Sequence, residues 1–472
     1  MKLTPNGEVI LTVNRFTLED AKKFASFSGD SNPLHIDPVI ARRSIAGDCI
    51  LHGIFGAMWC LDKILDLTDI TPKSLSIRFL KPVYLYTDIE LRLNQSLKEI
   101  YLMSEGVKLY VIEYKVGENG FDLSPEELEE EIEIIPPIKS PNILTFLECS
   151  SRKIMDFVFQ GESEVASEIF PNIYAKYGRV LTCEFATISK IVGMEVPGLN
   201  SLFLTCKIEL GIRNYEASNF SVIDADSRFK LIQIEYRAKK IMGNISALYL
   251  PISRTGIAMN QIEKQVLPGI FNGINALIIG GSRGLGEIVA KVLTTGGGKV
   301  TLTYNLGHSD AMNLQNEIAT NGRDCQIAYL NINDSSLEKF NLEGFNQIYY
   351  FATPRIIKEG EENSTRTEIM SYKIFYLSAF EEIVERVAKQ SRKTSIFYPS
   401  TDFINNPNPG FEVYSNIKLQ GEVLCQKLSD LHGIKIIFPR LPRFDTDQTR
   451  GLFESDFVDP IETILPLLQN MT

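Results

Sequence analysis

The stretch FASFSGDSNPLHIDPVIA, residues 24–41, leads by a short connection into HGIFGAMWCLDKILDL, residues 52–67, and together they decide the fold of the first part of the chain. The second stretch is apolar all round over its first two turns and too long for a buried strand, so it predicts a helix enclosed by a curved sheet. A shorter helix is expected over 18–27, capped by Thr17. Runs that alternate or carry β-branched and aromatic residues predict strands at 75–83, 88–95, 99–104 and 107–115. This is α+β organisation.

The length, composition and charge of the chain limit the number of domains, the class of protein and the kinds of partner. The 472 residues exceed the roughly 250 to 300 that one hydrophobic core supports, so we expect two or three domains. A hydrophobic share of 44% and a charged share of 23% are typical of a globular protein. The formal charge of -11, with no basic run to offset it, argues against nucleic acid or an anionic membrane as a partner.

The sequence contains no recognisable targeting segment and no recognisable metal-binding motif. The opening MKLTPNGEV has no hydrophobic core, and no apolar stretch approaches the roughly 20 residues of a membrane helix, so we expect a cytoplasmic protein. Seven scattered cysteines without a C-x-x-C pair, and only four histidines, predict neither a disulfide framework nor a metal site.

Two stretches are typical of linkers. The first, 118–142, is rich in glutamate and ends in prolines, and the second, 256–273, holds Pro and Gly before an apolar strand. They divide the chain into domains at 1–117, 143–255 and 274–472. The last domain alternates strand and helix, which predicts an α/β Rossmann-type doubly wound parallel sheet.

The first domain carries a recognisable motif. Residues 24–41 resemble the signature of the MaoC-like (R)-specific enoyl-thioester hydratases and dehydratases, a family with a hot-dog fold. The HG pair at 52–53 and RFLKPVY at 78–84 also resemble this family, and the resemblance covers about residues 8–116. The matching signature residues are Asp30, Asn32, Pro33, His35 and Asp37.

The chemistry explains why the motif needs these residue types. Moving water on or off C2 and C3 of an acyl thioester requires one group for the C2 proton and another for the oxygen at C3. The resemblance implies that Asp30 and His35 form this acid/base pair. Negative charge grows on the thioester oxygen, and the backbone N–H of Gly53 at a helix start is our candidate donor to it. Asn32 and Asp37 are expected to fix the loop by local hydrogen bonds.

The second domain looks like a silent copy of the first. The stretch KIVGMEVPGLNSLFLTCKIEL, residues 190–210, resembles a hot-dog segment of helix end, turn and strand, but the domain lacks a counterpart of the Asp/His motif. We interpret 143–255 as a non-catalytic half that shapes an acyl tunnel, which makes residues 8–255 a double hot-dog. The alternative is an unrelated α+β spacer.

The third domain resembles the short-chain dehydrogenase/reductases over about residues 274–450. INALIIGGSRGLGEIVAKVL, residues 274–293, places glycines between a strand and a helix, where a dinucleotide pyrophosphate binds. Downstream stand Tyr414-x-x-x-Lys418 and, fourteen residues before the tyrosine, Ser400. The cofactor contacts that follow are Gly280, Ser282, Arg283, Gly284, Leu285, Gly286, Asn331, Ile332, Tyr414 and Lys418.

Roles in this site come from the resemblance. Tyr414 is the acid/base, Lys418 lowers its pKa and holds the ribose, and Ser400 orients the substrate carbonyl. Because TLTYNLG at 301–307 lacks an acidic residue and Arg283 can meet a 2′-phosphate, NADP(H) is favoured, with NAD(H) as the other choice. The family's Asn-Asn-Ala-Gly is replaced here by residues 351–354, FATP, so a degenerate reductase stays open.

The expected function is a bifunctional enzyme that reduces 3-oxoacyl thioesters with NADPH and dehydrates the product in fatty-acid or polyketide-type biosynthesis. Its substrate is an acyl thioester of coenzyme A or acyl carrier protein, and a homo-oligomer is possible. The alternatives are hydration and NAD-dependent oxidation in acyl degradation, and a non-catalytic scaffold or binding module.

Overall fold

The structure is a computed structural model, and it divides into two compact units, Met1–Ile252 and Ser253–Thr472. The expected linker at 118–142 lies outside the described residues except for 140–142. No helix in the described part of the chain is long and apolar enough to cross a membrane. The described residues are 2–4, 7–117, 140–151, 154–157, 159, 161–211, 218–250, 256–354, 356, 366–390, 393–446 and 457–471.

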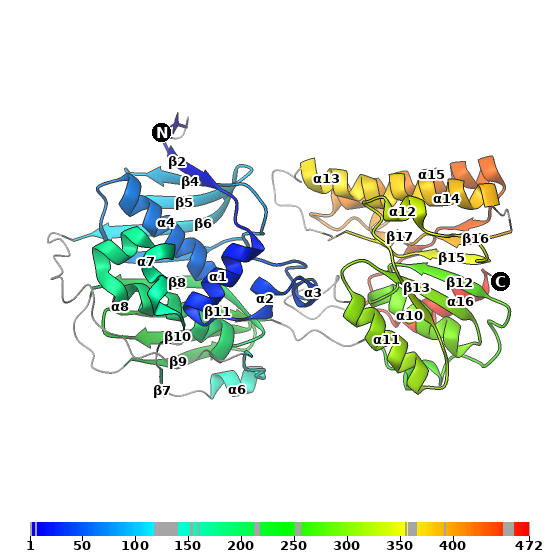
Figure 1. The fold of residues 1–472 in the computed structure, drawn as a ribbon, viewed down its shortest axis with the longest axis horizontal. Coiled ribbons are helices and arrows are strands. Elements are labelled where there is room, and N and C mark those ends of the chain that lie inside the picture. Colours follow the sequence, from blue (N-terminus) through cyan, green and yellow to red (C-terminus); the bar gives the residue numbers. More distant parts are fainter. Residues whose placement is uncertain are drawn as a thin grey trace. The chain divides into compact units, whose positions relative to one another are not determined.

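The first unit is built on one antiparallel sheet of eleven strands in the order β1-β2-β4-β5-β6-β3-β8-β11-β10-β9-β7 (Figure 1). The two halves of the sheet meet where β3 pairs with β8, with Ile77 opposite Cys206. The strands are β1 (Lys2–Leu3), β2 (Val9–Asn14), β3 (Pro72–Phe79), β4 (Ile89–Asn94), β5 (Glu99–Ser104), β6 (Val107–Val116), β7 (Met155–Asp156), β8 (Ser201–Leu210), β9 (Asn219–Asp226), β10 (Leu231–Arg237) and β11 (Ile241–Tyr249).

Helices of the first unit lie across this sheet (Figure 1). Each half supplies one long helix, α4 or α8, and the two helices pack against each other. Both halves share one hydrophobic core, which includes Ile64 and Phe185, both fully buried. The helices are α1 (Leu18–Ser28), α2 (Pro33–Ile36), α3 (Pro38–Ala41), α4 (Gly53–Leu67), α6 (Phe146–Ser150), the 3-10 helix η1 (Ser163–Val165), α7 (Ala166–Ile169), α8 (Pro171–Lys190) and the π-helical turn η2 (Ile191–Glu195).

The predicted helix over 53–67 is confirmed as α4, and its one buried charge has a structural role. Asp62, which is 2% exposed, accepts hydrogen bonds from the backbone N–H groups of Asn172 at 2.8 Å and Ile173 at 3.1 Å. These groups belong to the first turn of α8, where a helix has unpaired N–H groups and favours negative charge. The first half therefore caps the central helix of the second.

The helical stretch expected over 163–192 is divided into pieces. Gly178 inside α8 has φ of +80° and ψ of 171°, values that interrupt the helix and that glycine adopts without strain. At its other end α8 continues as η2, whose wider turn closes with Val196 N–H donating to the carbonyl of Ile191 at 2.8 Å. The periodicity of hydrophobic residues in the sequence indicates neither the interruption at Gly178 nor the π-helical turn.

The second unit holds a six-stranded parallel sheet in the order β14-β13-β12-β15-β16-β18, the Rossmann order, as predicted. A separate parallel pair joins β17 to β19. The strands are β12 (Asn275–Ile279), β13 (Lys299–Tyr304), β14 (Gln326–Tyr329), β15 (Gln347–Tyr350), β16 (Ser395–Phe397), β17 (Ser400–Thr401), β18 (Ile436–Ile437) and β19 (Arg440–Leu441).

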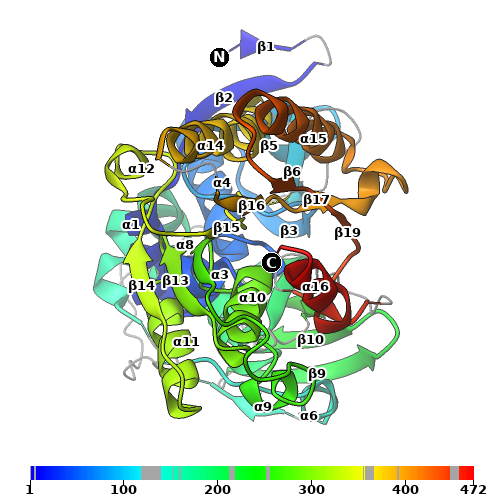
Figure 2. The same cartoon turned by 90° about the vertical axis from the view of Figure 1, so that its right-hand side faces the viewer.

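Helices cover both faces of this sheet, with α10, α11 and α16 on one side and α14 and α15 on the other (Figure 2). Alternate residues of β12 explain its uninterrupted apolar run: Ala276 and Ile278 join one core, and Leu277 and Ile279 the other. The helices are α9 (Met259–Ile262), α10 (Gly284–Thr295), α11 (His308–Thr320), α12 (Ser336–Lys339), α13 (Arg366–Lys373), the π-helical turn η3 (Ile374–Ser378), α14 (Ala379–Gln390), the 3-10 helix η4 (Asp402–Ile404), α15 (Glu412–His432) and α16 (Pro460–Gln469).

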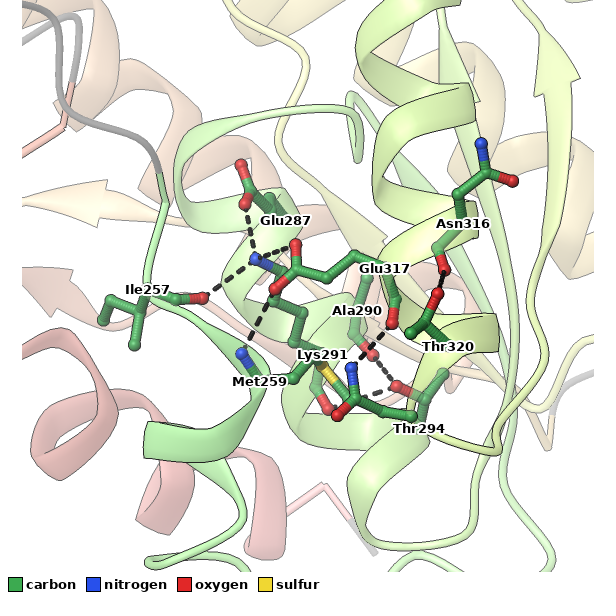
Figure 3. Close-up of polar contacts among 10 residues, drawn as sticks. Ile257, Met259, Glu287, Ala290, Lys291, Thr294, Asn316, Glu317 and Thr320 are labelled. Carbon is green, nitrogen blue, oxygen red and sulfur yellow. Dashed lines mark hydrogen bonds and ion pairs between the residues drawn. The ribbon is translucent and has the colours of Figure 1, made fainter.

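The segment 256–273, expected to be a linker, is part of the second unit. Met259 and Phe271 are 1% and 0% exposed and belong to its core. Lys291 of α10, 1% exposed, donates to the carbonyl of Ile257 at 2.8 Å and pairs at 2.8 Å with Glu287 and with Glu317 of α11 (Figure 3). The prolines and glycines of this segment therefore shape packed turns rather than a free connection.

Candidate active site

The loop between α1 and α3 carries the candidate acid/base residues. Gly29 ends α1 with φ of +75°, and the chain then turns to Asp30. Asn32 caps α2 and Asp37 caps α3, each through a side-chain oxygen that accepts backbone N–H groups. The expectation that these two side chains fix the loop locally is confirmed.

The ring of His35, on this loop, lies against the ring of His52 with a tilt of 30°. The ring centroids of His35 and His52 are 3.9 Å apart. His35 Nδ1 lies 2.8 Å from the carbonyl oxygen of Ile50, so this nitrogen donates its proton there and Nε2 is left as the acceptor. His52 Nε2 lies 3.0 Å from the carbonyl oxygen of Asp30 and donates to it. The backbone thus fixes which nitrogen of each ring carries the proton.

The candidate acid/base residues lie close together, with Asp30 buried and His35 half-buried. Asp30, His35 and His52 each bring a carboxylate oxygen or ring nitrogen within 4.8 Å of the other two. Burial raises the pKa of the Asp30 carboxyl, although His35 nearby and a hydrogen bond from Ser189 oppose the shift. Burial also lowers the pKa of His35, against the pull of Asp30. Both shifts move these groups toward their uncharged forms.

Such a trio can also be considered as a metal site. His35 Nδ1 and His52 Nε2 already donate hydrogen bonds to carbonyl oxygens. Burial also holds the pKa of His52 well below its usual value. The nitrogens left for a metal ion are His35 Nε2 and the buried His52 Nδ1, which has no hydrogen-bond partner among the described residues. The arrangement suits proton transfer, which needs one free imidazole nitrogen beside a carboxyl group.

Asp30 and His35 open on a pocket of about 540 Å³, its mouth included. Most of its walls are apolar or aromatic, and both halves of the first unit contribute to them. The other lining residues are Ile50, Leu51, Gly53, Phe79, Leu80, Lys81, Pro82, Tyr110, Val192, Gly193, Ser201, Leu202 and Phe203.

Gly53 places the start of α4 at the pocket wall. The first N–H groups of a helix have no partner within the helix, and the side chain of His52 makes no capping bond to them. A Cβ atom at Gly53 would lie 3.1 Å from Phe79 Cε1, so the position is tight as well as polar. The structure therefore brings together the three residues predicted for this site, Asp30, His35 and Gly53.

The second half reaches into the same site through η2 and the end of α8. Ser189 Oγ donates to Asp30 Oδ2 at 2.7 Å. Asn32 Nδ2 donates to the carbonyl oxygens of Gly193 at 2.9 Å and Gly198 at 3.3 Å. Sequence reasoning missed these contacts, because residues about 160 positions apart with no shared motif carry no local signal of proximity.

The predicted glycine turn of the second unit joins β12 to α10. Gly280 follows β12 with φ of +80°, and a Cβ there would lie 2.8 Å from the backbone N of Ala352. A Cβ at Gly286 would lie 2.8 Å from Gly281 Cα. Both positions therefore need glycine, and the turn brings the start of α10 close to the end of β12, where a pyrophosphate binds in this fold.

Other predicted cofactor residues lie at the same end of the sheet or within the turn. Ser282, Arg283 and Leu285 belong to the turn and the start of α10. Asn331 and Ile332 follow β14, and Asn331 Nδ2 donates to Asp334 Oδ2 at 2.9 Å. The carboxyl ends of parallel strands are where ligands bind in such sheets, so these positions suit their predicted role.

Ser400 and Tyr414 are brought to adjoining elements, since β17 contacts α15. The Ser400 hydroxyl donates to Glu422 Oε1, and Arg440 holds the same carboxylate with two bonds of 2.8 and 2.7 Å. Burial raises the pKa of Tyr414, whose hydroxyl is hydrogen-bonded to Thr401. A lowered pKa was expected here.

The neighbouring Lys418 is held by other groups. Its ammonium donates to the carbonyl oxygen of Pro399 at 2.6 Å and lies 4.0 Å from the ring centre of Tyr376 and 4.7 Å from that of Tyr398. Burial lowers the pKa of Lys418 to about 7. The lysine ammonium therefore donates to a carbonyl oxygen and lies over two aromatic rings.

Comparison with known proteins finds a family match for the first part of the chain. Residues 4–115 match the family described as MaoC like domain. No curated protein matches the chain. Among solved structures, a dehydrogenase/reductase from Sinorhizobium meliloti is 19% identical with a TM-score of 0.37, covering 45% of this chain and 91% of its own. A short-chain dehydrogenase from Burkholderia cenocepacia in complex with NADP is 22% identical with a TM-score of 0.34, covering 38% and 78%.

Proposed function

Because residues 4–115 form a MaoC-like domain, we propose that the first unit interconverts (R)-3-hydroxyacyl and 2-enoyl thioesters by removing or adding water. The observation that carries this proposal is the meeting of the buried Asp30 and the half-buried His35, within 4.8 Å of each other, at a mainly apolar pocket. The eleven-stranded unit is, in this proposal, a double hot-dog whose second half is silent.

The proposed mechanism assigns one proton transfer to each group. In dehydration, His35 Nε2 takes the proton from C2, and the carboxyl of Asp30 gives its proton to the C3 hydroxyl as the C3–O bond breaks and water leaves. The backbone N–H of Gly53 donates to the thioester oxygen as negative charge develops there. Hydration runs through the same steps in reverse.

The test is turnover of acyl thioesters by the full chain. Purified protein is incubated with (R)-3-hydroxybutyryl and crotonyl thioesters of coenzyme A and of acyl carrier protein, and the enoyl absorbance is followed. Asp30→Asn and His35→Gln should each lower kcat/KM by about 100- to 10,000-fold, the usual contribution of general acid–base groups. The carrier that is turned over identifies the partner.

Asp37→Asn is the matched control. Asp37 lies in the same motif, but its side chain caps α3, and asparagine caps as well as aspartate. This variant should keep activity within about threefold. Wild-type protein without turnover on any thioester, or an active Asp30→Asn variant, would refute the proposed reaction.

For the second unit we propose binding of a nicotinamide dinucleotide, NADP(H) in preference to NAD(H), at the turn 280–286. The support is the pair of positions, Gly280 and Gly286, that tolerate no side chain beside the start of α10. When bound, the cofactor supplies the hydride that would reduce a 3-oxoacyl thioester to the hydroxyacyl substrate of the first unit. Tyr414 would give its hydroxyl proton to the reduced oxygen, and Lys418 would have to leave Pro399 to assist it.

Measurements of nucleotide binding and of thioester reduction distinguish a biosynthetic enzyme, a degradative enzyme and a non-catalytic binding module. Titration with NADPH and NADH measures the preference, and oxidation of NADPH by acetoacetyl thioesters measures reduction. Preference for NADPH with turnover that Tyr414→Phe abolishes supports the biosynthetic direction, whereas preference for NAD supports acyl degradation. Tight nucleotide binding without turnover would favour a binding or scaffold module.

A further inference from the structure

The carboxyl of Asp30 is held from two sides, and only one of them is local. Asp30 Oδ1 accepts the backbone N–H of Asn32 at 3.2 Å, a bond within the loop. Oδ2 accepts the hydroxyl of Ser189 at 2.7 Å, across 159 positions of sequence. Both side chains are 1% exposed, so no bulk water competes for this bond.

Space around the same carboxyl is set by η2. A Cβ atom at Gly193 would lie 2.6 Å from Asp30 Oδ2 and closer still to Oδ1, so any side chain there displaces the carboxyl. The carbonyl of Gly193 meanwhile accepts Asn32 Nδ2 at 2.9 Å, which ties the loop to the turn. The wider π-helical turn brings both the Cα and the carbonyl of one residue against the loop.

We propose that Ser189 is a positioning residue for Asp30 and that Gly193 reserves the space for its carboxyl, so that the silent half sets the geometry of the active half. This inference rests on the proposed dehydratase function. A hydrogen bond that aims one carboxyl oxygen acts on the rate of proton transfer rather than on binding of the acyl chain.

Three substitutions test the proposal. Ser189→Ala should lower kcat for hydration of a crotonyl thioester by roughly 10- to 100-fold with KM nearly unchanged. Ser189→Cys, a weaker donor of similar size, should fall between Ala and wild type. Gly193→Ala should lower kcat further, because it moves the carboxyl itself. The control is Ser163→Ala, since Ser163 is buried and its hydroxyl has no hydrogen-bond partner among the described residues.

A readout without substrate separates this inference from the function it rests on. In protein labelled with ¹³C at aspartate Cγ, the signal absent from Asp30→Asn belongs to Asp30, and its titration gives the pKa. Loss of the hydroxyl that stabilises the ionised carboxyl should raise this pKa by about 1 in Ser189→Ala and leave it unchanged in Ser163→Ala. If wild type turns over nothing, the function fails while this shift still tests the contact. An unchanged pKa and kcat in folded Ser189→Ala, or full activity in Gly193→Ala, would overturn the inference.

Discussion

The carboxyl of Asp30 is buried, and this burial should have a measurable effect on stability. Its pKa in the folded protein is raised above the ordinary aspartate value of 3.8, so the folded state binds the proton more tightly than the unfolded chain does. The stability that this group contributes is complete below about pH 3.8 and is lost as pH rises through the folded pKa. Asp30→Asn should therefore raise the free energy of unfolding by roughly 1 kcal/mol at pH 8, and by less at pH 5.

Urea unfolding of the wild type and of Asp30→Asn at the two pH values measures the difference. Asp37→Asn, at an N-cap where both residue types serve, should show no such pH-dependent gain. A loss of stability in Asp30→Asn at pH 8 would contradict the expectation.

The mechanism that we propose for dehydration makes a prediction about pH dependence from the same pair. His35 must be neutral to accept the C2 proton, and its pKa is lowered from 6.5, so the rate should rise with pH below that value. Asp30 must hold a proton, and its pKa is raised from 3.8, so the rate should fall again only above that value. A profile of kcat/KM for an (R)-3-hydroxyacyl thioester between pH 4 and 9 shows both limbs. A single limb near the ordinary pKa of histidine would argue against the assigned roles.

The burial of Lys418 should lower the stability of the second unit at neutral pH. Its pKa in the folded protein is about 7, against an ordinary lysine value of 10.5, so stability is lost as pH falls from about 10.5 to about 7 and stays lower below it. Lys418→Met, similar in length and without charge, should raise the free energy of unfolding of this unit by about 1 to 3 kcal/mol at pH 7. Thermal unfolding at pH 7 and pH 10 measures this gain, which should shrink at the higher pH. A variant less stable than wild type at pH 7 would show that the bond to Pro399 outweighs desolvation.

At the scale of elements, the capping of α8 by α4 depends on Asp62. Asp62→Ala leaves the buried N–H groups of Asn172 and Ile173 without acceptors, which should lower the free energy of unfolding of the first unit by about 2 to 3 kcal/mol. Asp62→Asn keeps one acceptor and should cost about half as much. Asp66→Ala, exposed on the same helix, is the control and should change stability by less than about 0.5 kcal/mol. Equal losses at 62 and 66 would contradict the capping role.

Elements with strong local signals were predictable from the sequence. The apolar run of 53–67 and the Thr17 cap each gave a helix whose bounds lie within a residue of those found, and the glycine turn after β12 lies where expected. The break at Gly178 was not predictable, because an isolated glycine inside a helical pattern is tolerated and does not by itself mark an interruption. Strands β9 and β11 lacked a clear alternating pattern, and their pairing partners in the sheet define them.

Contacts between distant residues set the limit of prediction for the site. Asp30, His35 and Gly53 follow from one short motif, so the sequence placed them together. The direction of the Lys418 ammonium depends instead on Pro399 and on two tyrosine rings contributed by separate elements. Helical spacing shows only that Lys418 and Tyr414 share a face, and burial decides which groups they meet.

At the scale of the whole molecule, the first unit should fold only with both halves present. β3 pairs with β8 along the middle of the sheet, and α4 packs on α8. A fragment of residues 1–117 would expose the free edge of β3 and one side of α4, and an unpaired edge promotes association. We expect residues 1–252 to give a monomeric or discrete folded species with a cooperative transition, and 1–117 to aggregate or pair with itself. Size-exclusion chromatography and thermal melts distinguish the two, and a monomeric, cooperative 1–117 would contradict the expectation.

The place of Gly193 beside Asp30 has a consequence for how such a chain can change over time. A half without catalytic residues, as we propose for the second half of the first unit, would ordinarily tolerate many substitutions. Ser189 and Gly193 both contact Asp30, so substitutions at these three positions should be correlated. In related sequences we expect all three residues to be retained or all three to be replaced. A relative that keeps the aspartate at position 30 but has a bulky residue at position 193 should lack the proposed hydratase activity.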